Sequence, residues 1–380
     1  MAPMPASTRS SGASRSGPCR PRRCCPSTSS GPSRTRCCEA PAMPAPLVVD
    51  VHSHFFPRAF VDLVRSRGHR HGAGVTTWDD AEWLTMPGHP PIPLDPQFVD
   101  VDSRRAAVDK LGIGIQVLSL SPPMVYWAPP ELGRALAETF NDGIAEICRV
   151  HHGTFVGLAT LPLQDPALAV REAERAVGEL GLRGLYVASS VQGLYLDDAR
   201  FTPFWEFAQF QRVPVFTHPQ HHLGAEELGR FHLANTIGFP TETAVLAARL
   251  IYAGTLDRYP DVPVVLAHGG GVLPLLLGRL DHAHDRRPEC REAAAQPPSA
   301  YARRFFYDTV THSARVLGFL VDTVGVSRVV LGSDAPYDMA QTNPVGLVRR
   351  LGLSPQATRA VLGETAAKLL QLSVPVTEEG

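Results

Sequence analysis

Residues 47–57 read Leu47-Val48-Val49-Asp50-Val51-His52-Ser53-His54-Phe55-Phe56-Pro57, an apolar run that ends in two histidines. The β-branched first half is typical of a buried parallel strand. Side chains two residues apart point to the same face of a strand, so His52 and His54 would project together. If this strand lines a closed barrel, both imidazoles lie at its mouth, where neutral nitrogens can bind a divalent cation. An isolated His-x-His pair is weak evidence for a metal site, and later stretches must support it.

Seven further apolar, β-rich runs follow along the chain. They are residues 115–120, 154–159, 184–188, 213–217, 262–267, 305–310 and 328–333. Amphipathic stretches lie between several of these runs, at residues 132–150, 166–180, 241–259 and 355–370. Eight strands that alternate with helices predict an α/β fold, a (β/α)8 TIM barrel. A doubly wound open sheet ranks second, because no glycine-rich dinucleotide motif follows the first strand.

Two segments do not follow this alternation of strands and helices. Residues 1–42 are rich in Ser, Pro, Gly and Arg, a composition that cannot bury a core, so we expect a disordered extension there. The extension is not translated if synthesis begins at Met43, and a transit-like targeting segment is the alternative. The remainder, residues 43–380, is expected to form one barrel domain. Residues 55–101 hold six prolines and predict a long first loop or small insertion at the barrel mouth.

Composition argues against several classes of partner. The net charge of −1 gives no electrostatic reason to expect nucleic acid or an acidic membrane surface. No apolar run reaches the roughly 18 residues that a bilayer span requires. Adjacent pairs such as Cys24-Cys25 lack the spacing of a zinc site, and Cys148 and Cys290 lie far apart. This use of cysteine suits a reducing cytoplasm.

Polar residues stand where three of the later strands end. His218 follows the fifth run, His268 the sixth and Asp334 the eighth. Barrel enzymes carry their catalytic groups at the carboxyl ends of strands, and buried imidazoles and carboxylates are costly unless they are paired or coordinated. His221 and His222 fall beyond the fifth strand and are expected at the rim. The three glycines after His268 allow a close backbone approach and could contribute N–H donors.

Nitrogen and carboxylate donors with an open position suit Zn2+ or a similar divalent cation. No lysine ends the fourth strand, so a carbamylated lysine that bridges two metals is not expected. The sequence therefore favours a site for one metal ion per chain.

Further motifs accompany these strand ends, in the order 50–57 (DVHSHFFP), 197–198 (DD), 204–205 (FW), 216–219 (FTHP), 238–243 (GFPTET), 267–271 (AHGGG), 278–279 (GR), 306–308 (FYD) and 332–334 (GSD). In this order they resemble the amidohydrolase superfamily, and within it the aminocarboxymuconate-semialdehyde decarboxylase branch. The resemblance covers the chain from about Met43 to Leu372. It implies one Zn2+, held together with a water by His52, His54, His218 and Asp334.

The resemblance also assigns roles to other residues. His268 and Asp334 would be the catalytic residues, His268 as the acid/base and Asp334 also as a metal ligand. Arg279 would bind a substrate carboxylate across the interface of a homodimer. The implied activity is a carboxy-lyase reaction, the non-oxidative decarboxylation of an unsaturated or aromatic carboxylic acid. Proton delivery to the substrate carbon would precede the loss of CO2. A metal-dependent hydrolase of an amide, lactone or ester is the alternative, and a catalytically silent barrel is a third reading.

The chain departs from this branch near the substrate. Residues 235–237 (NTI) stand where the branch places an aromatic, and residues 335–337 (APY) stand where an aromatic often follows the aspartate directly. A second substrate arginine is expected on the long first loop, where Arg65, Arg67 and Arg70 are the candidates. The sequence thus predicts the metal site but leaves the identity of the small-molecule acid open.

Overall fold

The computed structural model describes residues 46–220 and 224–373, which belong to one compact unit, Ala45–Gly380. The expected extension over residues 1–42 lies outside the described residues, as do Met43, His221 and His222. The expectations for these residues stay predictions.

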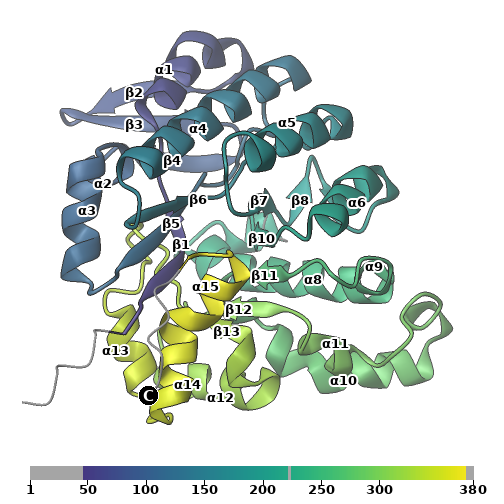
Figure 1. Ribbon diagram of the computed structural model, residues 1–380. Coiled ribbons are helices and arrows are strands. Elements are labelled where there is room, and N and C mark those ends of the chain that lie inside the picture. Colours follow the sequence, from purple (N-terminus) through teal and green to yellow (C-terminus); the bar gives the residue numbers. More distant parts are fainter. Residues whose placement is uncertain (1–45, 221–223, 374–380) are drawn as a thin grey trace, which may run out of the picture. The chain divides into compact units, whose positions relative to one another are not determined.

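Eight parallel strands of the described chain form the centre of this unit (Figure 1). They are β1 Val49–His54, β5 Ile115–Ser119, β6 Phe155–Gly157, β7 Leu185–Ala188, β10 Val215–His218, β11 Val264–Leu266, β12 Phe306–Asp308 and β13 Val329–Val330. Parallel pairing joins β1-β5-β6 and β13-β12-β11-β10-β7. Parallel bridges from Ala159 to Leu185 and from Ser53 to Ala335 close the ring. All eight strands overlap the predicted runs, so the predicted TIM barrel is confirmed.

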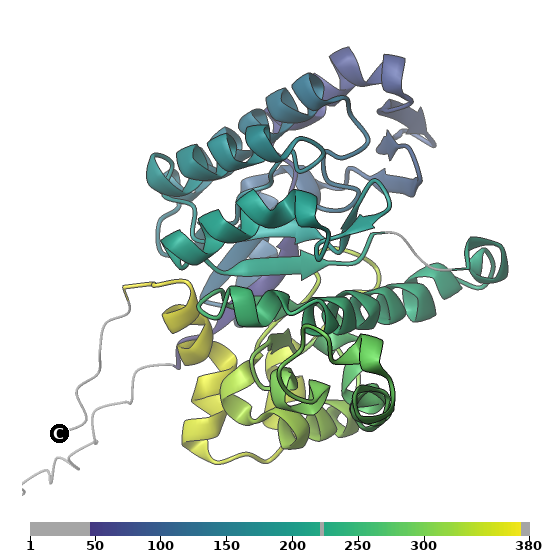
Figure 2. The same cartoon turned by 90° about the vertical axis from the view of Figure 1, so that its right-hand side faces the viewer.

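Helices follow the strands and surround them (Figure 2). The longer ones are α1 Arg58–Arg67, α3 Val101–Lys110, α4 Pro130–Val150, α5 Pro166–Gly178, α6 Thr202–Gln211, α8 Phe239–Tyr252, α10 Leu273–Arg286 and α12 Ala314–Val324. Short helices are α2 Pro96–Val99, α7 Ala225–Leu228, α9 Thr255–Arg258, α11 Pro298–Ala302, α13 Pro344–Arg349, α14 Pro355–Arg359 and α15 Thr365–Leu369.

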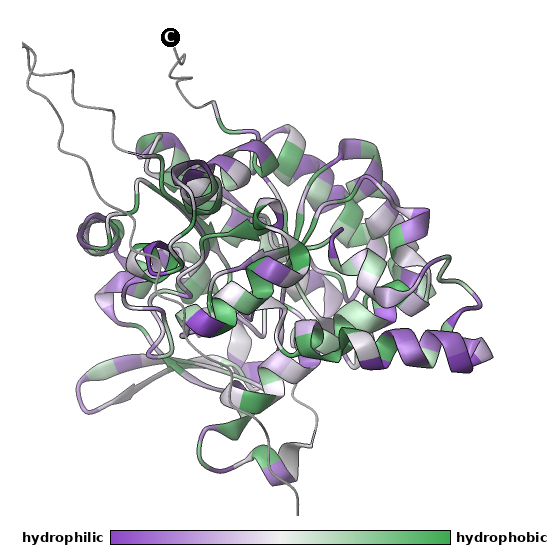
Figure 3. Cartoon of the chain, turned by 90° about the horizontal axis from the view of Figure 1, so that it is seen from below, coloured by the Kyte–Doolittle hydropathy of each residue, from purple (hydrophilic) through white to green (hydrophobic). Residues whose placement is uncertain are grey.

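Helix α4 illustrates why these segments pack on the barrel. Its buried residues Leu132, Leu136, Phe140 and Ile144 recur every four positions. A helix turns once in 3.6 residues, so this spacing places the four side chains on one face. Figure 3 shows the same alternation of hydrophobic and hydrophilic residues along most helices.

The connection after β1 is a folded insertion. It holds α1 and an antiparallel sheet of β2 Gly74–Trp78, β3 Ala81–Met86 and β4 His89–Pro93. The sequence predicted a loop or small insertion without this sheet. Its prolines concealed β4, which is an edge strand and can therefore lack some backbone N–H donors.

Buried polar contacts tie this insertion to the mouth of the barrel. Arg104 of α3 is 1% exposed, and its guanidinium donates to the carbonyl oxygens of Gln97 and His54. The backbone at the end of β1 is thereby held by a side chain from the far end of the insertion.

A small hairpin of β8 Ser190–Val191 and β9 Leu194–Tyr195 follows β7.

Candidate metal centre

The barrel brings four donor residues together at the carboxyl ends of its strands. They are His52 and His54 at the end of β1, His218 at the end of β10 and Asp334 shortly after β13. One ligand atom from each residue lies within 4.8 Å of the others, and all four side chains are buried. Residues that the sequence singled out at three strand ends therefore meet at one point.

Hydrogen bonds on the outer ring nitrogens orient two of the imidazoles. His52 Nδ1 lies 2.6 Å from Asp308 Oδ2, and His218 Nδ1 lies 2.6 Å from the carbonyl oxygen of Pro219. These contacts leave Nε2 of each ring available to a ligand. His52 Nε2 is buried and has no hydrogen-bond partner within the described part of the chain. Neutral imidazoles with such outer partners, grouped around a carboxylate, fit a divalent cation.

The carboxylate of Asp334 lies among the rings. Its Oδ1 is 3.0 Å from His54 Nε2 and 3.3 Å from His52 Nε2. Burial by itself raises the pKa of Asp334, but the adjacent His52 and His268 outweigh this effect and hold the pKa well below its usual value. Asp334 is therefore ionised, as a carboxylate ligand must be.

The electrostatic environment also sets the state of the histidines. Burial lowers the pKa of His54 to about 4 and that of His218 well below its usual value, so both rings are neutral. Burial lowers the pKa of His52 too, but the charges of Asp334 and Asp308 outweigh it and raise the pKa to about 9. A cation at His52 Nε2 therefore replaces a proton that these carboxylates already favour.

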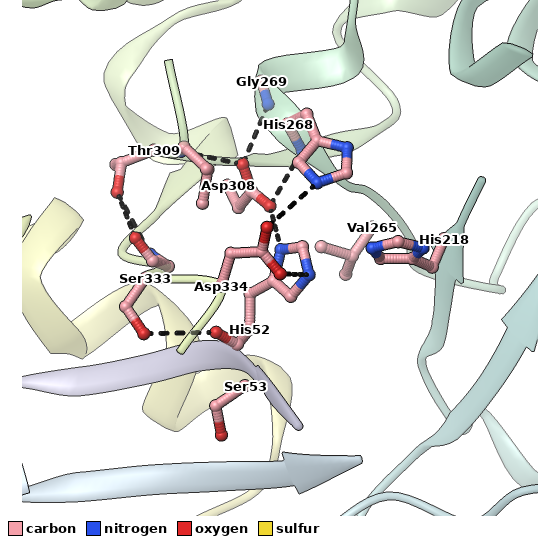
Figure 4. A network of polar contacts seen from close by, with 12 residues as sticks. His52, Ser53, His218, Val265, His268, Gly269, Asp308, Thr309, Ser333 and Asp334 are labelled. Carbon is pink, nitrogen blue, oxygen red and sulfur yellow. Dashed lines mark hydrogen bonds and ion pairs between the residues drawn. The ribbon is translucent and has the colours of Figure 1, made fainter. Parts of the chain in front are cut away.

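Asp308, at the end of β12, connects the donor cluster to the loop that carries His268. Its Oδ2 contacts His52 Nδ1 and accepts from the backbone N–H of His268 at 2.9 Å. Its Oδ1 accepts from the N–H groups of Gly269 at 2.8 Å and Val310 at 2.9 Å (Figure 4). The sequence gave Asp308 a place in a motif but no role. Its position at a strand end is the signal that could have found it.

Backbone conformation at the site is unusual and is held by these contacts. His268 has φ +54° and Asp334 has φ +65°, in the left-handed region that residues other than glycine rarely adopt. Asp308 accepts from the N–H of His268, while the N–H of Asp334 donates to the carbonyl oxygen of His52 at 2.8 Å. At Gly332 a Cβ would lie 3.0 Å from that of His52 and 2.9 Å from that of Asp308, so only glycine fits without displacement.

His268 stands beside the donor cluster but is not one of its four members. Its Nε2 lies 3.6 Å from Asp334 Oδ2, and its ring centroid is 5.0 Å from that of His218. Its side chain is 14% exposed, more than the side chains of Asp334, His52 and His54. In Figure 4 its ring lies across Asp334 from the end of β1. His268 is therefore placed to contact both the cluster and a bound molecule.

A pocket of about 630 Å3 includes His268 and Asp334. This volume lies in the range of small-molecule sites. Asn235 and Thr236, in the region where the sequence departs from its branch, contribute to the wall. Helix α10 contributes Pro274 and Leu275, and helix α12 contributes Arg315, Val316, Phe319 and Leu320. The walls are therefore apolar with a few polar groups.

The sequence also departs from the branch at residues 335–337, where the aromatic residue comes later than expected. Tyr337 comes three residues after Asp334, yet its ring centroid lies 5.3 Å from that of His54, and its hydroxyl hydrogen-bonds with Ser121. An aromatic side chain thus packs on a donor histidine although the sequence places it later than expected.

The expected substrate arginines lie elsewhere. Arg279 is exposed on α10 and does not line the pocket in the described chain. Arg65 pairs with Asp62 and Glu82 in the first insertion. Neither it nor Arg67 or Arg70 is among the pocket residues that the structure describes. The arginine that does line the pocket is Arg315, which the sequence analysis did not single out.

Comparison with known proteins identifies the family. A family model described as amidohydrolase matches residues 49–372. The chain belongs to the amidohydrolase family. The chain is 30% identical over 341 residues to 2-amino-3-carboxymuconate-6-semialdehyde decarboxylase from Dictyostelium discoideum, a match that covers 86% of this chain and 92% of the relative. The predicted superfamily and branch are thus confirmed.

Solved structures give the same result for the fold of the chain. The 5-carboxyvanillate decarboxylase from Sphingomonas paucimobilis has a TM-score of 0.74 at 28% identity, with 87% of this chain and 100% of that chain covered. A dihydroxybenzoic acid decarboxylase from Polaromonas sp. JS666, solved with bound manganese, has a TM-score of 0.72 at 28% identity, with 86% and 98% covered. Together with the buried donor set, the manganese-bound neighbour supports a divalent metal in this protein.

The contacts of Asp308 generate a prediction about metal affinity. In Asp308→Asn the side chain keeps its shape but loses negative charge and one acceptor, so His52 is held less firmly. Removal of such an outer partner costs about 10- to 100-fold in metal affinity. Competition with a chromogenic chelator measures this loss. The control is Asp322→Asn, an exposed position on α12, which should bind metal as the unmodified protein does. Equal affinity in both variants would contradict the role given to Asp308.

Proposed function

We propose that this protein is a metal-dependent, non-oxidative decarboxylase of an unsaturated or aromatic carboxylic acid. The observation that carries the proposal is the position of His268, which lies next to four metal donors and also lines the pocket. A general acid must reach both the substrate and a source of protons. The relatives described above are named as decarboxylases, which supports a carboxy-lyase over a hydrolase.

Four residues would hold one divalent cation, which we propose to be Zn2+: His52, His54, His218 and Asp334. When bound, the cation would act as a Lewis acid toward a substrate oxygen. Asp308 would keep His52 in place through its contact with Nδ1. The backbone contacts of Asp308 to residues 268 and 269 would set the distance between His268 and the donors.

His268 would deliver a proton to the substrate carbon that bears the carboxylate. The bond between this carbon and the carboxylate then breaks, its electron pair restores the unsaturated system, and CO2 leaves. One proton is consumed for each CO2 released, and His268 regains it from solvent through the pocket. Asp334 would assist because its Oδ2, 3.6 Å from His268 Nε2, helps to orient the ring.

We further propose a homodimer in which Arg279 contacts the substrate of the partner subunit. On α10, Leu275 is 72% exposed and Leu276 is 37% exposed, and Arg279 lies one turn beyond Leu275 on the same face. A face with exposed leucines at the edge of the pocket suits contact with a second copy.

A cytoplasmic location is also proposed. It rests on Cys148 and Cys290, which are free thiols in the described chain. None of the described helices combines the length and apolar content that a membrane crossing requires.

Assays of product and of metal content test the proposed function together. The purified protein, loaded with Zn2+, is expected to release CO2 from at least one member of a panel of unsaturated and aromatic acids. His268→Ala should keep about one metal per chain but lose roughly 10²- to 10⁴-fold in kcat, the usual size of a general acid contribution. His152→Ala, an exposed position after α4, is the matched control and should keep full activity.

Two results would overturn this reading. Formation of a new carboxylate from an amide, lactone or ester, without CO2 from any acid, would make the protein a hydrolase. A His268→Ala protein that contains no metal would make His268 a ligand rather than the acid.

The position of Arg279 generates a separate prediction about assembly. Arg279→Ala should raise KM without loss of metal, because a contact to a carboxylate is removed and no ligand is. If the arginine acts across the interface, exchange of subunits between Arg279→Ala and His268→Ala proteins should restore part of the activity. Arg286→Ala, farther along α10, is the control and should leave KM unchanged. No recovery after verified subunit exchange would rule out action across the interface.

A further inference from the structure

The wall of the pocket contains a positively charged side chain, Arg315, that the proposed chemistry does not use. Arg315 lies in the first turn of α12 and lines the same pocket as His268 and Asp334. Within the described chain, no ion pair, hydrogen bond or ring contact engages its guanidinium. The first turn of α12 contains no acidic residue that could neutralise the charge. The guanidinium is therefore free to bind a group that enters the pocket.

Four residues of α12 line the pocket and differ in exposure. Arg315 and Phe319 are four residues apart, as are Val316 and Leu320, so these pairs form one stripe along the helix. Leu320 is 2% exposed, Phe319 is 42% exposed and Val316 is 51% exposed, while Arg315 is also exposed. Among these four pocket residues Leu320 is the most buried, and Arg315 is an exposed one near the start of the helix.

The buried end of the stripe lies next to the proposed acid. A Cβ built on Gly269, the residue after His268, would lie 3.5 Å from Leu320 Cδ2. Leu320 and Arg315 are five positions apart, which corresponds to about 7.5 Å along the helix axis. The stripe therefore leads from the neighbourhood of His268, over apolar side chains, to a guanidinium at the mouth.

The loop before α12 fixes the backbone of the helix at Arg315. Ser313 caps the helix through its hydroxyl, which accepts from the N–H of Val316, and the N–H of Leu317 donates to the carbonyl oxygen of Ser313. A cation on a fixed backbone loses less freedom on binding than one on a mobile loop. A guanidinium also matches a planar carboxylate with two parallel N–H donors.

We propose that Arg315 binds a second anionic substituent of the substrate, on the side of its body away from the carboxylate that leaves as CO2. The preferred substrates are then acids with a second carboxylate, separated from the first by an apolar unsaturated or aromatic body that packs along α12. Arg315 acts within its own subunit, unlike Arg279, and occupies the role that the sequence analysis sought on the first loop. This inference rests on the proposed function for the placement of the reacting carboxylate.

Binding of two unreactive probes tests the inference without turnover. Isophthalate and benzoate share an aromatic ring and one carboxylate, and isophthalate carries a second. Calorimetry on the zinc-loaded protein should show about 10- to 100-fold tighter binding of isophthalate, the size expected for hydrogen bonds to charged groups. In Arg315→Ala this preference should disappear while zinc content stays the same. Arg315→Lys should keep only part of it, because lysine keeps the charge but lacks the planar pair of donors.

Arg303→Ala is the matched control, because Arg303 is an exposed arginine that is not among the pocket residues of the described chain. It should keep the full preference for isophthalate. Equal binding of both probes by the unmodified protein, or an undiminished preference in Arg315→Ala, would overturn the inference. Neither readout requires CO2 release, so a failed decarboxylation assay would count against the proposed function alone.

Discussion

The buried carboxylate of Asp308 is the constraint on which the rest of the site depends. It joins a ring nitrogen of one donor histidine, at 2.6 Å, to the backbone that carries the proposed acid. A buried carboxylate is costly unless hydrogen bonds satisfy it, and Asp308 contacts His52 and accepts from three backbone N–H groups. Metal binding and proton transfer are therefore positioned by the same side chain.

A second buried carboxylate performs a similar task one layer deeper. Asp50 Oδ1 accepts from the N–H of His52 at 3.1 Å and of Ser333 at 2.9 Å, while its Oδ2 accepts from Ser333 Oγ at 2.6 Å and Gln116 Nε2 at 2.8 Å. Burial raises the pKa of Asp50, and these hydrogen bonds act in the opposite direction. Asp50 thereby links β1, β5 and the segment after β13, so the donors arise from a rigid base. The left-handed conformation of Asp334 is tolerated for the same reason, because its surroundings fix it.

Much of this arrangement could be predicted because parallel barrel strands are buried on both faces and appear as continuous apolar runs. The donors could be predicted because His218 and Asp334 lie at or shortly after the ends of such runs. Asp308 was placed in a motif but given no role, since its partners are mostly backbone N–H groups, which a sequence does not display. The sheet of β2, β3 and β4 was missed because few of its residues are buried and because β4 contains three prolines. Arg315 could not be found at all, since only the packing of α12 against the pocket gives it a role.

X-ray absorption spectroscopy of the zinc-loaded protein measures the first coordination shell directly. Three imidazole nitrogens and one carboxylate oxygen are predicted, at about 2.0–2.2 Å, with a further position open to water. The number of imidazole ligands should be the same in the unmodified protein and in His268→Ala. A shell with four imidazoles in the unmodified protein and three in His268→Ala would contradict the separation of metal binding from proton transfer.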